Sequence, residues 1–150
     1  MERGFTLIEV LIYIVLFSLI IGGGMLGVYQ IIEGSDKTSA KTMAEQESIF
    51  FLRKLNWAMT GATSVSVPNP TRLIITKGGL ATEFRLTGKV IEIGGPSFVQ
   101  LTNDSVKISS LSFEMTLPSF SKPASIETRF TAKGPKGDSQ IFKSTKYLRQ

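Results

Sequence analysis

The first clear pattern in the chain is an uncharged apolar run close to the N-terminus. Residues Val10 to Ile32, 23 in all, carry no charged side chain and are mainly Leu, Ile, Val and Phe. As a helix this run would be about 34 Å long, enough to cross a bilayer with some tilt. It is longer than the roughly 7–15 apolar residues of a secretory signal, and no small-residue cleavage site follows it. The pattern by itself predicts a single-span membrane anchor.

A second pattern, with helical periodicity, covers residues 37 to about 59. Its apolar positions recur at spacings of three, four and seven, which places them in one stripe along a helix. The stripe consists of Ala40, Ala44, Phe51, Leu55 and Ala58. The opposite side carries Thr42, Gln46, Arg53, Asn56 and Thr60. Ile49 and Trp57 do not fit the stripe.

We therefore predict that the segment is an amphipathic continuation of the membrane helix. One helix would then run from Phe5 to about Met59, roughly 80 Å at 1.5 Å per residue. The polar residues Glu33-Gly34-Ser35-Asp36 separate its two halves and predict a kink or an exit from the membrane surface.

Beyond Gly61 the chain consists of short apolar and β-branched runs separated by turn residues, which is typical of strands. The predicted strands are Ser64–Val67, Arg72–Thr76, Ala81–Leu86, Val90–Ile93, Phe98–Leu101, Val106–Leu117, Ile126–Ala132 and Ile141–Leu148. Such short spacing favours antiparallel hairpins. In the sixth run the inward-facing positions change parity at Ser109-Ser110, which predicts a β-bulge or a break.

These patterns together predict an α+β fold. A long N-terminal helix, half transmembrane (5–32) and half amphipathic (33–60), would pack on an antiparallel β-sheet formed by residues 61–150. The loop Gly134-Pro135-Lys136-Gly137-Asp138 is predicted to be a hairpin connection. A calcium loop is disfavoured because it would need several oxygen ligands, and only one acidic side chain is present.

The composition narrows the possible chemistry. The chain has no Cys and no His, which excludes disulfides and removes the usual ligands of zinc, copper and iron and the commonest general base. No motif supports catalysis by the remaining residue types, so we expect neither an enzyme nor a cofactor or metal site. The net charge is +5, and basic residues are concentrated from Lys122 to the C-terminus. Nucleic acid or anionic lipid could meet such a surface, but a solvated basic face is the favoured interpretation.

Two polar residues stand at the edge of the apolar run. Glu9 precedes it directly, and a carboxylate drawn into hydrocarbon costs about 2.5–3.5 kcal/mol or more unless it is paired. Thr6 and Glu9 have the spacing of a capping box, with Thr as N-cap, which would start a helix at this point. The capping box alone explains both residues without any function.

The seven residues Gly4-Phe5-Thr6-Leu7-Ile8-Glu9-Val10, followed at once by an apolar span, resemble the N-terminal signature of type IV pilins and pseudopilins. The position four residues from the start suits a short leader peptide, residues 1–4. The direct match covers about the first 30 residues, and the remainder is similar to the family in architecture only.

The resemblance implies a role for three residues. A prepilin peptidase would cut between Gly4 and Phe5, and Phe5 would become the N-methylated N-terminus of the mature chain. Glu9 would then meet the terminal amine of a neighbouring subunit during assembly. A buried ammonium and a carboxylate offset each other's desolvation when they pair, so the pair would set the register of the subunits.

The chain departs from many major pilins in two respects. It has no proline in the apolar span, where Gly22-Gly23-Gly24 occurs instead, and it has no Cys for a C-terminal disulfide loop. Each glycine costs a helix interior roughly 1 kcal/mol relative to alanine, so the triplet is either a weak point or a site of close helix packing. The missing proline favours a minor pilin or pseudopilin.

The resemblance implies a structural subunit of a type IV pilus, a type II secretion pseudopilus or a competence pilus. Its partners would be other pilin or pseudopilin subunits, a prepilin peptidase, an inner-membrane assembly platform and, before assembly, membrane lipid. It would begin as a single-pass precursor in the cytoplasmic membrane and end in a cell-surface or envelope-spanning filament. Two alternatives remain open: a binding module at the filament tip for DNA or another anionic ligand, and a plain signal-anchored extracytoplasmic domain.

Overall fold

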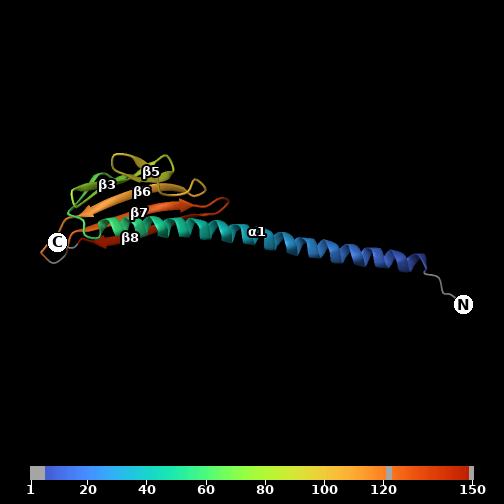
Figure 1. Ribbon diagram of the computed structural model, residues 1–150. Helices are drawn as coiled ribbons and strands as arrows, with labels where there is room; N and C mark the ends of the chain where they lie inside the picture. Colours follow the sequence, from blue (N-terminus) through green and yellow to red (C-terminus); the bar gives the residue numbers. More distant parts are fainter. Residues whose placement is uncertain (1–5, 121–122, 149–150) are drawn as a thin grey trace. The chain divides into compact units, whose positions relative to one another are not determined.

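A computed structural model of the chain describes residues 6–120 and 123–148. It has an α+β, pilin-like fold, in which one long N-terminal helix, α1 (Leu7–Met59), packs against antiparallel β-sheets (Figure 1). The predicted fold class and the predicted end of the helix are thereby confirmed. The chain divides into two compact units, one ending at Lys37 and the other, called the body below, beginning at Thr38.

Helix α1 continues through the polar stretch at residues 33–36, where a kink or surface exit was predicted. Within this stretch, one pair of charged side chains favours the helical conformation. Lys37 Nζ lies 2.8 Å from Glu33 Oε1, four residues earlier, and such pairs favour an exposed helix by about 0.2–0.5 kcal/mol. The stretch therefore marks a change from uncharged to charged surface within one helix.

The described residues of the body, 38–120 and 123–148, form eight strands, all close to the predicted ranges. They are β1 (Ser64–Asn69), β2 (Arg72–Lys77), β3 (Leu80–Thr87), β4 (Val90–Gly94), β5 (Phe98–Gln100), β6 (Lys107–Thr116), β7 (Ser125–Lys133) and β8 (Ser139–Tyr147). Within each sheet, consecutive strands pair antiparallel, as predicted. The turn between β2 and β3 consists of Gly78 and Gly79, both with positive φ, as a two-residue hairpin turn of type I′ requires.

The strands form two sheets, where the sequence predicted one. The first has the order β1-β2-β3-β4-β5 and the second the order β6-β7-β8. In the connection after β5, Thr102 is buried and its hydroxyl accepts a hydrogen bond from the Ile91 amide at 3.0 Å. Backbone hydrogen bonds nevertheless join the sheets, from Ile108 to Lys89 (2.8 Å) and from Phe113 to Pro70 (2.7 Å).

The predicted bulge in β6 is present. Pairing between β6 and β7 shifts register between Ser109 and Ser112, and Ser110 has a φ of 54°. The extra residue returns Leu111 and Phe113 to the buried side after Ile108.

The hydrophobic core lies between the body's part of α1 and the two sheets. All five residues of the predicted stripe, Ala40, Ala44, Phe51, Leu55 and Ala58, are buried. Phe51 joins the sheets, since its ring centroid lies 6.2 Å from that of Phe84 in β3 and 5.2 Å from that of Phe130 in β7. Ser48 is buried as well, and its hydroxyl donates to the Ala44 carbonyl at 2.6 Å.

Candidate functional site: the N-terminal part of helix α1

The first turn of α1 begins where the sequence predicted it. The carbonyl of Thr6 accepts hydrogen bonds from the amides of Glu9 (3.1 Å) and Val10 (3.3 Å), so Thr6 occupies the N-cap position. In the described part of the chain, no side-chain hydrogen bond of the capping box joins Thr6 to Glu9. Glu9 is half-buried in the first turn, where the positive end of the helix dipole favours a carboxylate.

The predicted processing site cannot be placed on this geometry. Gly4 and Phe5 lie outside the described residues. Of the three site residues that the resemblance implies, only Glu9 is therefore described.

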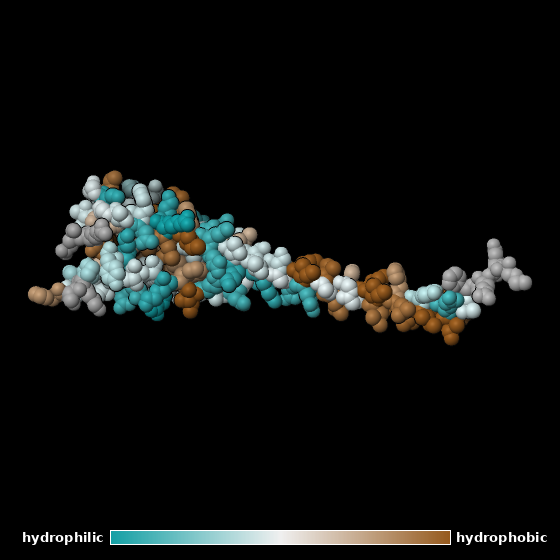
Figure 2. Space-filling view, turned by 90° about the horizontal axis from the view of Figure 1, so that it is seen from below, coloured by the Kyte–Doolittle hydropathy of each residue, from teal (hydrophilic) through white to brown (hydrophobic). Residues whose placement is uncertain are grey.

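The N-terminal part of α1 exposes its apolar side chains all round. The large apolar residues between Leu7 and Ile32 are 45–81% exposed. Figure 2 shows apolar colours prevailing along the visible face of this segment. Of the described helices, α1 is long and apolar enough to cross a membrane, judged by length and composition. So much apolar surface is unfavourable in water, so the segment requires lipid or other helices around it.

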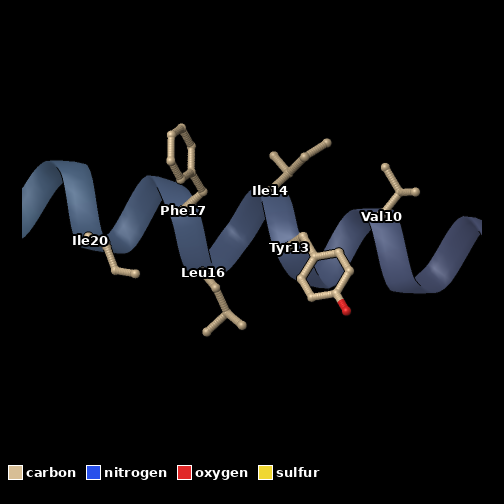
Figure 3. Close-up of a pocket in the computed structure, with 6 residues that line it drawn as sticks. All are labelled: Val10, Tyr13, Ile14, Leu16, Phe17 and Ile20. Atoms are coloured by element: carbon tan, nitrogen blue, oxygen red, sulfur yellow. The ribbon is translucent and has the colours of Figure 1, made fainter.

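The side chains of this segment form two rows with a shallow groove between them. Figure 3 shows Val10, Ile14 and Phe17 projecting to one side and Tyr13, Leu16 and Ile20 to the other. Spacings of three and four residues produce such rows on any helix, and a neighbouring helix packs its own row into the groove between them. Glu9 lies four residues before Tyr13 and so belongs to the second row.

The glycine triplet remains helical, and the chain itself gives no packing reason for it. A Cβ atom added at Gly22, Gly23 or Gly24 would meet no other atom within 4 Å, and the same holds at Gly27. Whether the triplet is a weak point or a place of close approach therefore depends on contacts with other molecules.

The basic C-terminal region is partly neutralised. Arg129 and Lys143 both lie 3.0 Å from the same carboxylate, Glu127. The hydrogen bond from Lys143 chiefly, with that from Arg129, holds the pKa of Glu127 below its usual value. Lys122 and Arg149 lie outside the described residues. In the described ranges no three His, Cys, Asp or Glu side chains are grouped to hold a metal ion.

The first 25 residues match a known family model. Residues 1–25 match the prokaryotic N-terminal methylation motif. This motif supports a type IV pilin-like prepilin. It suggests a structural rather than a catalytic protein, and it implies in general pilin-subunit partners and processing by a prepilin peptidase. With the apolar helix, it is consistent with a membrane-anchored precursor.

No curated protein and no solved structure matches the chain. The family match therefore covers residues 1–25 of the N-terminal segment and does not extend to the body.

Proposed function

We propose that the protein is a structural subunit of a type IV pilus, a type II secretion pseudopilus or a competence pilus. The precursor would be held in the cytoplasmic membrane by residues 5–32, cut between Gly4 and Phe5, and methylated on the amine of Phe5. The observation that carries this proposal is the methylation motif at residues 1–25 leading directly into a helix whose apolar side chains are exposed on every side.

Assembly would exchange lipid for protein around the same helix. The segment loses little hydrophobic free energy when it leaves lipid for a bundle of similar helices, because both surroundings are apolar. What favours the bundle is close packing of side-chain rows into grooves, for which the rows of Val10 and Tyr13 are suited. The mechanism is mechanical, and it requires no chemistry after processing.

Glu9 would set the register between subunits in this mechanism. Its carboxylate would pair with the terminal amine of Phe5 in a neighbouring subunit, and a wrong stagger would leave both charges unpaired in apolar surroundings. We expect Glu9→Gln to reduce the fraction of the protein recovered in sheared filaments by at least about tenfold, since one uncompensated charge costs more than about 1.4 kcal/mol. Glu33→Gln is the matched control, because Glu33 is exposed and pairs locally with Lys37. Equal recovery of Glu9→Gln and wild type would refute the register role.

The experiment that tests the proposal as a whole is the intact mass of the membrane-extracted protein, produced with and without a prepilin peptidase. Loss of Met1 to Gly4 together with gain of one methyl group is the expected result. An uncut chain, beside a control prepilin cut in the same cells, would identify a plain signal anchor.

We further propose that the protein is a minor subunit of its filament. Its support is the absence of proline from the apolar span and of Cys from the whole chain, both of which differ from many major pilins. Quantification of the protein in purified filaments tests it, and a stoichiometry close to that of the main subunit would contradict it.

A further inference from the structure

One edge of the second sheet is open along a long, regular strand. The order β6-β7-β8 places β8 at this edge, and within residues 6–120 and 123–148 no strand pairs with its outer side (Figure 1). β8 has nine residues, no proline and no register shift against β7. A regular edge strand of this length presents a row of unpaired backbone groups, with which another extended chain can pair.

The other sheet edges are blunted. β5 has three residues, and β1 contains Pro68 and a register shift between Ser66 and Asn69. β6 has the bulge described above, and its amides at Ile108 and Phe113 donate hydrogen bonds to turns of the first sheet. Short length, proline, bulges and covering segments are common ways in which proteins prevent strand addition at an edge. In the described part of the body, β8 has none of these four protections.

The pairing of β7 with β8 shows which backbone groups face the open side. Leu148 N donates to the Ala124 carbonyl at 2.8 Å, and this bond continues the β7–β8 register. Hydrogen-bonded and non-bonded pairs alternate along an antiparallel ladder, so the even-numbered residues of β8 bond to β7. The odd-numbered residues therefore direct their N–H and C=O groups outward, and those at the centre of the strand are Ile141, Lys143 and Thr145.

The side chains of β8 restrict the kind of strand that can be added. The strand carries Lys143 and Lys146 and no acidic residue. Two copies pairing through β8 would place like charges on adjacent strands, so the lysines oppose self-association of this edge. Lys143 Nζ already lies 3.0 Å from Glu127 Oε1 in β7, which shows that it can pair with a carboxylate on an adjacent strand. Ile141, 76% exposed on the same face as Lys143, offers an apolar contact as well.

We infer that the open edge of β8 binds an extended acidic segment of another polypeptide, which adds a fourth strand to the sheet β6-β7-β8. Backbone hydrogen bonds to Ile141, Lys143 and Thr145 supply the affinity, and carboxylates beside the two lysines supply the selectivity. The inference goes beyond the proposed function and does not depend on it. The edge lies in the body, and it would be equally open in a plain signal-anchored domain.

The test uses the full-length chain in detergent micelles and two fluorescent peptides of nine residues, the length of β8. In one peptide glutamate alternates with valine, and in the control peptide lysine replaces every glutamate. Fluorescence anisotropy measures binding, and amide hydrogen exchange followed by nuclear magnetic resonance locates it. Two variants are compared with wild type: Thr145→Pro removes one outward N–H, and Thr145→Ala keeps it. Proline is tolerated on an edge strand where the missing donor would face solvent.

We expect the glutamate peptide to slow amide exchange at Ile141, Lys143 and Thr145 by at least about tenfold, with little change at the even-numbered residues already bonded to β7. It should bind at least about fourfold more tightly than the lysine peptide, because each lysine of β8 then meets an opposite charge instead of a like charge. Thr145→Pro should weaken binding by at least about tenfold, since a hydrogen bond is lost and the ring obstructs the added strand. Thr145→Ala should bind like wild type.

Four results would overturn the inference: neither peptide binds at about 1 mM, both peptides bind equally, the protected amides lie away from the odd-numbered positions of β8, or a folded Thr145→Pro binds like wild type. Loss of protection at the even-numbered amides would show that the proline variant has unfolded. In that case the comparison of the two peptides and the protection pattern in wild type decide the question.

Discussion

Two adjacent phenylalanines on α1 allow the folding of the body to be separated from its assembly. Phe51 is fully buried and makes edge-to-face contacts with the rings of Phe84, at an interplanar angle of 63°, and Phe130, at 78°. Its ring thus joins the helix to both sheets. Phe50 is 45% exposed and lies outside the core. Phe51→Ala and Phe50→Ala therefore remove the same group from two different environments.

The expected loss for Phe51→Ala is large relative to the stability of a single domain. Removing a buried phenylalanine ring costs about 3–5 kcal/mol, which includes the lost ring contacts and the cavity left behind. A typical domain has a free energy of unfolding of about 5–15 kcal/mol. For a unit of this size each kcal/mol lowers Tm by about 4 °C, so we expect a decrease of roughly 12–20 °C. Phe50→Ala should stay within about 0.5 kcal/mol of wild type.

The assay is urea and thermal unfolding of residues 38–150, followed by far-ultraviolet circular dichroism. This fragment is appropriate because every buried apolar residue of the described chain lies at or after Ala40. The m-value is the slope of the free energy of unfolding against urea concentration. An m-value equal to that of wild type would show that both variants unfold from the same compact state. A cost below about 1 kcal/mol for Phe51→Ala, or equal costs for the two variants, would refute this account of the core.

Two further predictions use the same fragment. Gly134→Ala should lower the free energy of unfolding by about 1–3 kcal/mol, because the added Cβ would overlap the backbone carbonyl of Ala40 and the hairpin would have to move. Lys133→Ala, at the exposed neighbouring position, is the control and should leave this free energy nearly unchanged. An equally small effect of Gly134→Ala would contradict the close contact with Ala40. The pKa of Glu127 is lowered in the folded state, chiefly by Lys143, so the unfolded chain takes up a proton first and stability should fall as the pH decreases through and below 4.5. Glu127→Gln should reduce this acid sensitivity when Tm is compared at about pH 7 and pH 3, and an unchanged loss in the variant would show that other carboxylates are responsible.

The sequence alone was sufficient to predict those elements whose structure is determined by a local periodicity of apolar residues. The buried stripe of α1 follows from helical spacing, and the eight strands follow from short apolar runs between turn residues. The change of parity at Ser109-Ser110 predicted the bulge, because alternation along a strand ties each side chain to one face. Packing against the sheets then selects the helical and strand conformations that these patterns favour.

The sequence was insufficient where structure depends on partners distant in the chain. The division into two sheets is one example, because no local pattern indicates that β5 and β6 do not pair. For the polar stretch at residues 33–36 the sequence predicted a kink or an exit from the membrane surface within one helix. The spacing of Glu33 and Lys37, four residues apart, was the signal that the helical backbone continues there.

The distribution of burial along α1 makes the two halves of the helix separable in experiments. No residue between Leu7 and Ile32 contributes to the core, so substitutions there should leave the unfolding of the body unchanged. A variant of Glu9 that fails to enter filaments would then fail through assembly and not through unfolding. Conversely, Phe51→Ala should destabilise the body and leave the apolar helix able to insert in the membrane, since insertion depends on the uncharged run alone. Two results would be needed together: Phe51→Ala is processed but does not assemble, and Glu9→Gln fails to assemble although its body stays folded. They would show that the apolar segment positions the subunit in the filament, and that the body must be folded for the subunit to be retained there.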